Sequence, residues 1–152
     1  MAFEFDLDTE ATVSVIVSKD SAIKGTSEEA YEKYSESLNE SHLTFVDGVE
    51  PTRFVLLKTL PYRDSKLVMN SQVTVGENNK PQVNISFIMD EVRCALQGID
   101  GPNSSAYIKD KSDGYVDKKV INFLYNRGVL MDLYNARRNA GGDGEEDVPK
   151  KS

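Results

Sequence analysis

The stretch Arg53-Phe54-Val55-Leu56-Leu57-Lys58-Thr59 contains the densest apolar run of this 152-residue chain, Phe54 to Leu57. β-Branched and aromatic residues favour extended backbone, and a short continuous apolar run is typical of a strand covered on both faces. We therefore predict a central strand at residues 53–59. Pro51 limits how early this strand can begin, because proline cannot donate a hydrogen bond to a neighbouring strand.

The strands predicted to accompany this central strand come earlier in the sequence. Leu43 to Phe45, followed by Asp47-Gly48, predicts a strand and a turn that lead into the central strand. Further upstream, the odd-numbered valines of a β-branched segment predict a strand from Thr12 to Ser18.

Residues 3–8 alternate apolar and acidic side chains, and they form either another strand or an arm. An extended chain places the two kinds of side chain on opposite sides. The acidic side would be a solvated face that keeps an edge strand from aggregating, and the apolar side would dock on a partner. The protein-binding residues that we expect are Phe3, Phe5, Leu7, Glu4, Asp6, Asp8 and, within the loop from 101 to 114, Tyr107.

The first two predicted helices lie on either side of the central strand. Thr26-Ser27-Glu28-Glu29 has the pattern of a capping box, so Thr26 would cap a helix at residues 27–39. Pro61 suits a first helical turn, where its missing N–H would be unpaired in any case. A helix over residues 62–73 follows, with a loop at residues 76–80 after it.

The second half of the chain is predicted to be mainly helical. An apolar stripe predicts a helix from Pro81 to Gly98, and residues 100–114 form the longest expected loop. Asp113 would cap a last helical region that runs to Ala140, and Gly128 would divide it.

The chain is therefore expected to have an α+β fold in a single domain, residues 1–140. A small antiparallel β-sheet of about three strands would pack with four or five α-helices. Residues 141–152 consist of Gly, Asp, Glu, Lys, Pro and Ser with one Val, which is too polar to offset the entropy of ordering, so we expect a disordered C-terminal tail.

Charge and composition exclude several classes of partner. The net charge is −7, and residues 1–50 hold 12 acidic against 3 basic side chains. No large basic cluster is available to neutralise phosphates, so direct nucleic acid binding is not expected. The longest apolar run is four residues, which is too short for a membrane span, and an acidic N-terminal stretch does not resemble a signal peptide.

Residue types with catalytic potential are present without the partners that catalysis needs. His42 lies beside Ser41, but no nucleophile-elbow pattern accompanies them, so we expect His42 to be a surface residue at a helix end. Cys94 is expected in the core, and Asp90 and Glu91 on the surface. No glycine-rich phosphate-binding motif occurs, so we expect neither a cofactor nor an enzyme.

Two segments, Glu50 to Asp64 and Val92 to Asp100, resemble segments of small tailed-bacteriophage virion and tail-assembly proteins. Glu50 to Asp64 is similar to an apolar run with a basic residue that leads through a turn into a helix. Val92-Arg93-Cys94-Ala95-Leu96-Gln97-Gly98-Ile99-Asp100 is similar to a helix end written Val-Arg-x-x-Leu-x-Gly followed by an apolar residue. With a closing helical region at Val116 to Ala140, the resemblance covers residues 43–140.

This resemblance implies a non-enzymatic assembly protein, either chaperone-like or a minor structural subunit. Its partners would be other phage structural or tail proteins, its location the host cytoplasm or the virion, and homo-oligomerisation is left open.

Two other hypotheses come from different classes of protein. The acidic first third of the chain could imitate DNA and inhibit a host defence or nucleic-acid-binding protein. Salt-sensitive binding to a nuclease, lost on neutralising the acids at positions 4, 6, 8 and 10, would indicate this function. An enzyme is the third hypothesis, and a pocket that joins His42 to Ser41 or to an acid would favour it.

Overall fold

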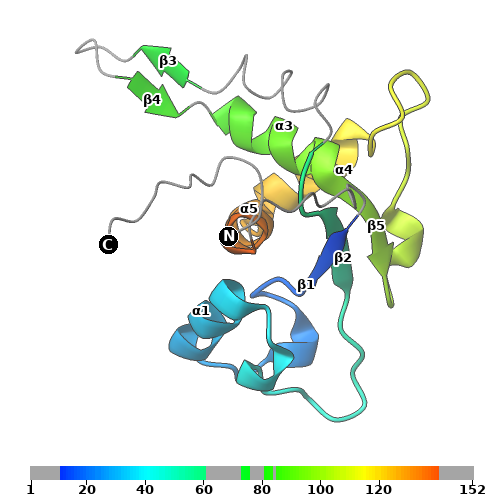
Figure 1. The fold of residues 1–152 in the computed structure, drawn as a ribbon. Coiled ribbons are helices and arrows are strands. Elements are labelled where there is room, and N and C mark those ends of the chain that lie inside the picture. The colour runs from blue at the N-terminus through cyan, green and yellow to red at the C-terminus, as the bar shows by residue number, and fades with distance from the viewer. Residues whose placement is uncertain (1–10, 61–72, 76–80, 84, 141–152) are drawn as a thin grey trace, which may run out of the picture.

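A computed structural model of the chain describes residues 11–60, 73–75, 81–83 and 85–140 (Figure 1). A three-stranded antiparallel sheet in the order β1-β2-β5 lies at its centre. The strands are β1 (Thr12–Val15), β2 (Arg53–Leu57) and β5 (Leu96–Asp100). The predicted α+β class, with a small antiparallel sheet, is confirmed.

β2 is the central strand, as its apolar run predicted. Val15 of β1 pairs with Phe54, and Ile99 of β5 pairs with the same residue from the other side. Leu56 and Leu57 point to opposite faces and both are buried, so the sheet is covered on both faces at this position.

The strand predicted at Leu43 to Phe45 is wrong. Thr44 instead exchanges two hydrogen bonds with the side chain of Thr26, at 3.0 and 3.2 Å. Val46 donates its backbone N–H to the carbonyl of Ala22, and Leu43 is buried in a small apolar cluster. Both edges of β2 are already occupied by β1 and β5, so this segment packs as a loop.

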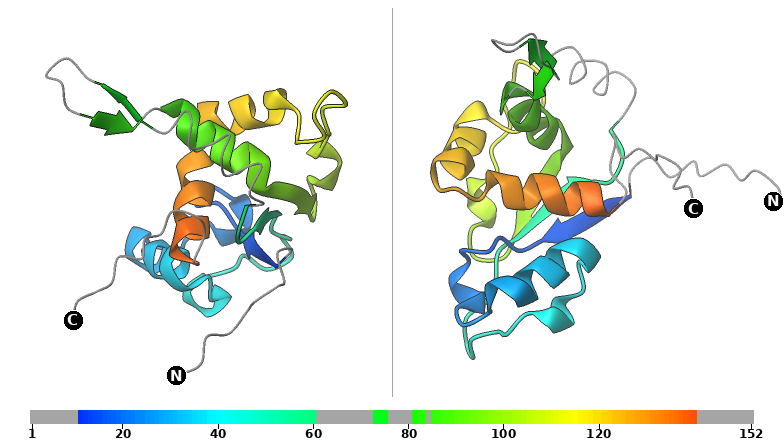
Figure 2. Two further views of the ribbon diagram at one scale, coloured as in Figure 1. Left: turned by 45° about the horizontal axis from the view of Figure 1, so that its top comes forward. Right: turned by 90° about the vertical axis from the view of Figure 1, so that its left-hand side faces the viewer.

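Four α-helices of the described residues surround the sheet: α1 (Glu28–Ser37), α3 (Ile85–Ala95), α4 (Lys118–Asn126) and α5 (Leu130–Asn139). α5 contacts α1, α3 and α4, and it also contacts strands β1 and β2. Figures 1 and 2 show α1 at one end of the molecule and α3 at the other, with α5 between them. Three short 3₁₀ helices are η1 (Ser21–Ile23), η2 (Glu40–His42) and η3 (Ser104–Ala106).

The helix predicted at residues 27–39 is confirmed as α1, but a different residue caps it. The Ser27 side chain accepts a hydrogen bond from the N–H of Ala30 at 3.1 Å. Thr26 is not the cap, because its hydroxyl is engaged by Thr44.

The helix predicted from Pro81 to Gly98 is too long at both ends. Pro81–Val83 forms strand β4, which pairs with β3 (Val73–Val75) in a hairpin that projects from the start of α3 (Figures 1 and 2). At the other end, Leu96–Asp100 leaves α3 and becomes β5. The helix expected at residues 62–73 lies outside the described residues except for Val73, which opens β3. The loop expected at 76–80 also lies outside them.

The last helical region is divided at Gly128, as expected. Gly128 has φ +75°, a conformation that glycine adopts without a steric penalty, and α4 ends just before it. The cap of α4 is Asp117, whose carboxylate accepts from the N–H of Lys119 at 2.9 Å. Asp113 was the predicted cap, but it binds Arg93 instead.

Two tyrosines of α1 cover the outer edge of β1. The Tyr34 hydroxyl accepts from the backbone N–H of Ile16 at 3.0 Å and lies 3.5 Å from the carbonyl oxygen of Ser14. The Tyr31 hydroxyl donates to the carbonyl of Ile16 at 2.8 Å. These hydroxyls take the place of a further strand, and burial raises the pKa of both tyrosines.

The Tyr34→Phe variant should lose about 1–3 kcal/mol of stability, because the buried N–H of Ile16 would have no acceptor. Urea unfolding followed by circular dichroism measures the loss. Tyr125→Phe is the matched control, since Tyr125 is 48% exposed. Equal stability of the two variants would contradict the role given to Tyr34.

Candidate functional site

An open groove of about 600 Å³ lies at the end of the sheet where β1 stops and β2 begins. Four segments that are distant in sequence form its walls: the turn after β1, the loop before β2, the start of the loop after β5, and the end of α4. The lining residues are Val17, Lys19, Asp20, Ser21, Gly48, Val49, Glu50, Thr52, Phe54, Pro102, Asn103, Phe123, Leu124, Arg127 and Val129.

The floor of the groove is apolar and belongs to the core. Val17, Phe54 and Leu124 are buried and reach the groove from the segment after β1, from β2 and from α4. Two apolar side chains of the lining are instead largely accessible, since Phe123 is 53% and Val49 is 39% exposed. Exposed apolar side chains above an apolar floor are the arrangement that receives an apolar ligand group.

Asp20 joins two walls of the groove. One of its carboxylate oxygens accepts from the N–H of Ala22 at 2.8 Å, and the other accepts from the N–H of Thr52 at 2.9 Å. The hydroxyl of Thr52 in turn accepts from the side-chain amide of Asn103 at 3.0 Å. These bonds hold the segments after β1, before β2 and after β5 in a fixed arrangement.

Lys19 and Arg127 form the basic wall of the groove. The Lys19 ammonium donates to the carbonyl of Arg127 at 2.9 Å, which ties the turn after β1 to the end of α4. The Arg127 guanidinium lies 4.7 Å from the centre of the Phe123 ring, within cation–π range. Neither cation forms an ion pair with a carboxylate among the described residues.

A buried ionic centre lies elsewhere, between α3, α5 and the end of β2. Glu91 accepts from Arg137 at 2.7 Å and from Arg138 at 2.6 Å, and Arg137 also donates to the carbonyl of Leu57 at 2.7 Å. Glu91 is 1% and Arg137 0% exposed. The prediction that Glu91 is a surface charge is therefore wrong, because α3 turns it toward α5.

Arg93 anchors the loop at residues 109–116. Its guanidinium donates to the carbonyl of Val116 at 2.7 Å and pairs with Asp113 at 2.9 Å. The hydrogen bond from Arg93 holds the pKa of Asp113 below its usual range. The pKa of Asp110 is lowered chiefly by hydrogen bonds from Ser112. Arg93 thus positions this loop and leaves Cys94 as a buried core residue, as expected.

The residues expected to bind a partner are placed only in part. The six expected within residues 3–8 lie outside the described residues. Tyr107 is half-buried, donates its hydroxyl to the carbonyl of Leu96 at 3.2 Å, and does not line the groove. Its loop does contribute Pro102 and Asn103. His42 is half-buried at the end of η2 and is not in the groove.

The groove residues that sequence reasoning missed are Lys19, Val49, Phe123 and Arg127. One of them left a signal. Ile121 and Leu124 are three residues apart and mark the buried stripe of α4, whereas Phe123 is offset from Leu124 by about 100°. A phenylalanine outside the buried stripe of a short helix indicates an exposed aromatic side chain.

A scan against models of known protein families, a search of curated proteins and a search of solved structures each returned no match. Within the described residues, no helix is long and apolar enough to span a membrane. The same residues contain no group of three or more His, Cys, Asp or Glu side chains arranged to hold a metal ion.

Proposed function

We propose that the protein is a non-enzymatic binding protein that holds a short segment of another protein chain in this groove. The observation that carries the proposal is the exposed Phe123 ring beside the apolar floor. Exposed aromatic side chains at the centre of such surfaces supply much of the affinity in protein interfaces.

The polar groups of the groove support binding rather than catalysis. Both carboxylate oxygens of Asp20 accept backbone N–H groups, and the Lys19 ammonium donates to a backbone carbonyl. These groups hold the walls in place. A preorganised groove gains affinity because little ordering is needed on binding.

The resemblance to tailed-phage virion and tail-assembly proteins supplies the class of partner. On this proposal the bound segment belongs to a tail or head component, and the protein acts during assembly in the host cytoplasm or remains in the virion. The resemblance implies binding to other proteins, and the groove independently supports the same role.

Binding can be measured with fluorescent peptides that tile the tail and head proteins encoded beside this chain. At least one peptide should bind, and Phe123→Ser should weaken it by about tenfold or more, as truncating an aromatic anchor does. Tyr125→Ser is the matched control, because Tyr125 is exposed on the same helix but does not line the groove. Binding by no peptide, or equal effects of the two variants, would reject the proposal.

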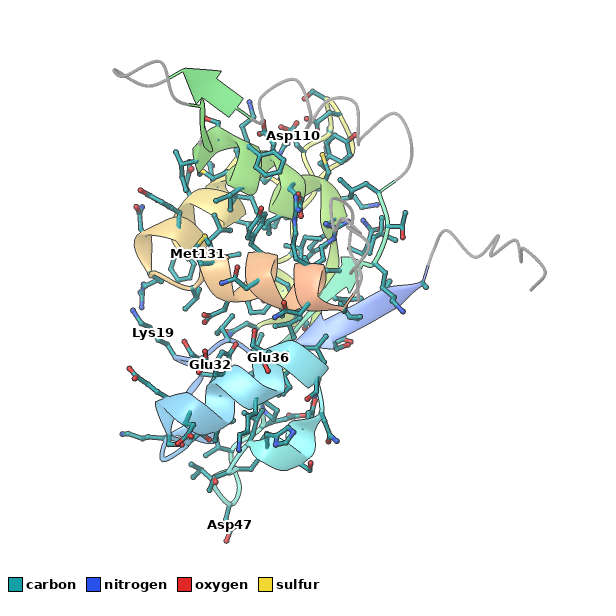
Figure 3. The ribbon with its side chains drawn as sticks, turned by 60° about the vertical axis from the view of Figure 1, so that its left-hand side comes forward. Lys19, Glu32, Glu36, Asp47, Asp110 and Met131 are labelled. Atoms are coloured by element: carbon teal, nitrogen blue, oxygen red, sulfur yellow. The ribbon has the colours of Figure 1, made fainter. Side chains whose placement is uncertain are left out.

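A second candidate function, imitation of DNA, is favoured by the exposed acids of α1. Glu28, Glu29, Glu32 and Glu36 are exposed, and Glu32 and Glu36 lie on the same side of the helix (Figure 3). On this candidate, Glu32→Gln with Glu36→Gln would weaken salt-sensitive binding to a nuclease and leave the tiled peptides bound as before.

A further inference from the structure

The groove combines an apolar floor with a basic wall, which defines the chemistry of its occupant. Lys19 and Arg127 line the groove without a carboxylate partner among the described residues, and Arg127 lies over the Phe123 ring, whereas the two carboxylate oxygens of Asp20 each accept from a backbone N–H. Glu50 is exposed at another part of the lining. An occupant with apolar side chains on one side and carboxylates next to them would satisfy the floor and the basic wall together.

This chain carries a segment with that pattern. Residues 3–8 read Phe-Glu-Phe-Asp-Leu-Asp. In an extended conformation the apolar side chains would lie about 7 Å apart on one side and the carboxylates would project from the other. The apolar set would face the floor formed by Val17, Phe54 and Leu124, and the charge of the acidic set is opposite to that of Lys19 and Arg127.

The direction of β1 favours a segment from a second copy. Thr12, where the strand begins, pairs with Leu57, whereas the groove lies at the opposite end, near the pair Val15 and Phe54. A segment returning within the same copy would run along the outer edge of β1. That edge is occupied, because the hydroxyls of the two α1 tyrosines bind the outward backbone groups of Ile16.

We infer that residues 3–8 of a second copy occupy the groove, so that the protein associates with itself by exchanging this segment. The inference rests on the proposed function, because the same groove takes the segment of the assembly partner. The two occupants therefore compete, and self-association protects the exposed Phe123 ring until a partner segment displaces the second copy.

Sedimentation velocity of the full chain over a wide concentration range tests the inference. The wild type should associate reversibly and less strongly as salt is added. Phe3→Ser with Phe5→Ser (the arm variant) and Arg127→Glu (the groove variant) should each weaken association by about tenfold or more. Lys118→Glu is the matched charge control, since Lys118 is exposed on α4 and does not line the groove.

Mixing the two variants gives the decisive measurement. The arm variant keeps an intact groove and the groove variant keeps an intact segment, so the mixture should associate more strongly than either variant alone. Circular dichroism melting checks that both are folded, and Phe123→Ser replaces the groove variant if Arg127→Glu is not. A monomeric wild type, or a mixture that stays monomeric, overturns the inference.

Failure of this inference is distinguishable from failure of the proposed function. The arm variant should bind the tiled peptides at least as tightly as the wild type, because it lacks the competing segment. If the tiled peptides bind and the wild type is monomeric, the exchange of residues 3–8 between copies is rejected and the proposed function stands. If the wild type associates with itself and no tiled peptide binds, the proposed function in phage assembly is rejected and the exchange between copies stands.

Discussion

The Glu91→Gln variant is expected to lose about 3–5 kcal/mol of unfolding free energy, because it removes the buried carboxylate that pairs with both Arg137 and Arg138. Small domains are stable by only about 5–15 kcal/mol, so this loss would be a large fraction of the total. Urea unfolding monitored by circular dichroism measures it. The change keeps the size of the side chain, so the loss reports on the charge rather than on a cavity.

The geometry predicts an order among variants of this centre. Arg137 is fully buried and reaches both Glu91 and the backbone of β2, whereas the side chain of Arg138 is 22% exposed. Arg137→Gln should therefore cost more than Arg138→Gln. Replacing both Glu91 and Arg137 by methionine should cost less than Glu91→Gln, because both partners of the fully buried ion pair are then removed together.

A matched control is Glu36→Gln on α1, which makes the same chemical change at an exposed position. Its unfolding free energy should stay within about 0.5 kcal/mol of the wild type. If Glu91→Gln were equally harmless, the ion pair would not be part of what holds α5 to the end of β2.

Local features of the fold were predictable because they depend on neighbouring residues. The continuous apolar run marked β2, the capping-box pattern at residues 26–29 marked the start of α1 although Ser27 rather than Thr26 is the cap, and Gly128 marked the break between α4 and α5. Each of these signals needs only a few adjacent side chains, so the sequence pattern and the structure agree.

Features that join distant segments were not predictable in the same way. Leu96 and Ile99 continue the helical spacing of the residues before them, so β5 was predicted as the end of a helix. Glu91 was predicted to be exposed because its partner, Arg137, lies 46 residues away. The groove depends on four such segments, and no local pattern indicated that they meet.

Gly101→Ala is expected to destabilise the protein and to disrupt the groove together. Gly101 has φ +102°, which alone costs other residues about 1–3 kcal/mol. An added Cβ would also lie 2.5 Å from the carbonyl oxygen of Pro51, a contact that must be relieved by moving the backbone. We expect a loss of more than about 2 kcal/mol in urea unfolding from these two effects.

The same clash explains why binding should fall as well. Moving Pro51 away from Gly101 pulls Thr52 from Asn103, and these two residues are bonded across the groove. Affinity for a peptide with the sequence of residues 1–10, measured by fluorescence anisotropy under conditions where the variant stays folded, should drop by about tenfold or more. Gly98→Ala is the matched control, because its added Cβ meets no atom within 4 Å. A folded Gly101→Ala variant that bound the peptide as tightly as Gly98→Ala would show that the approach of Pro51 to Gly101 does not shape the groove.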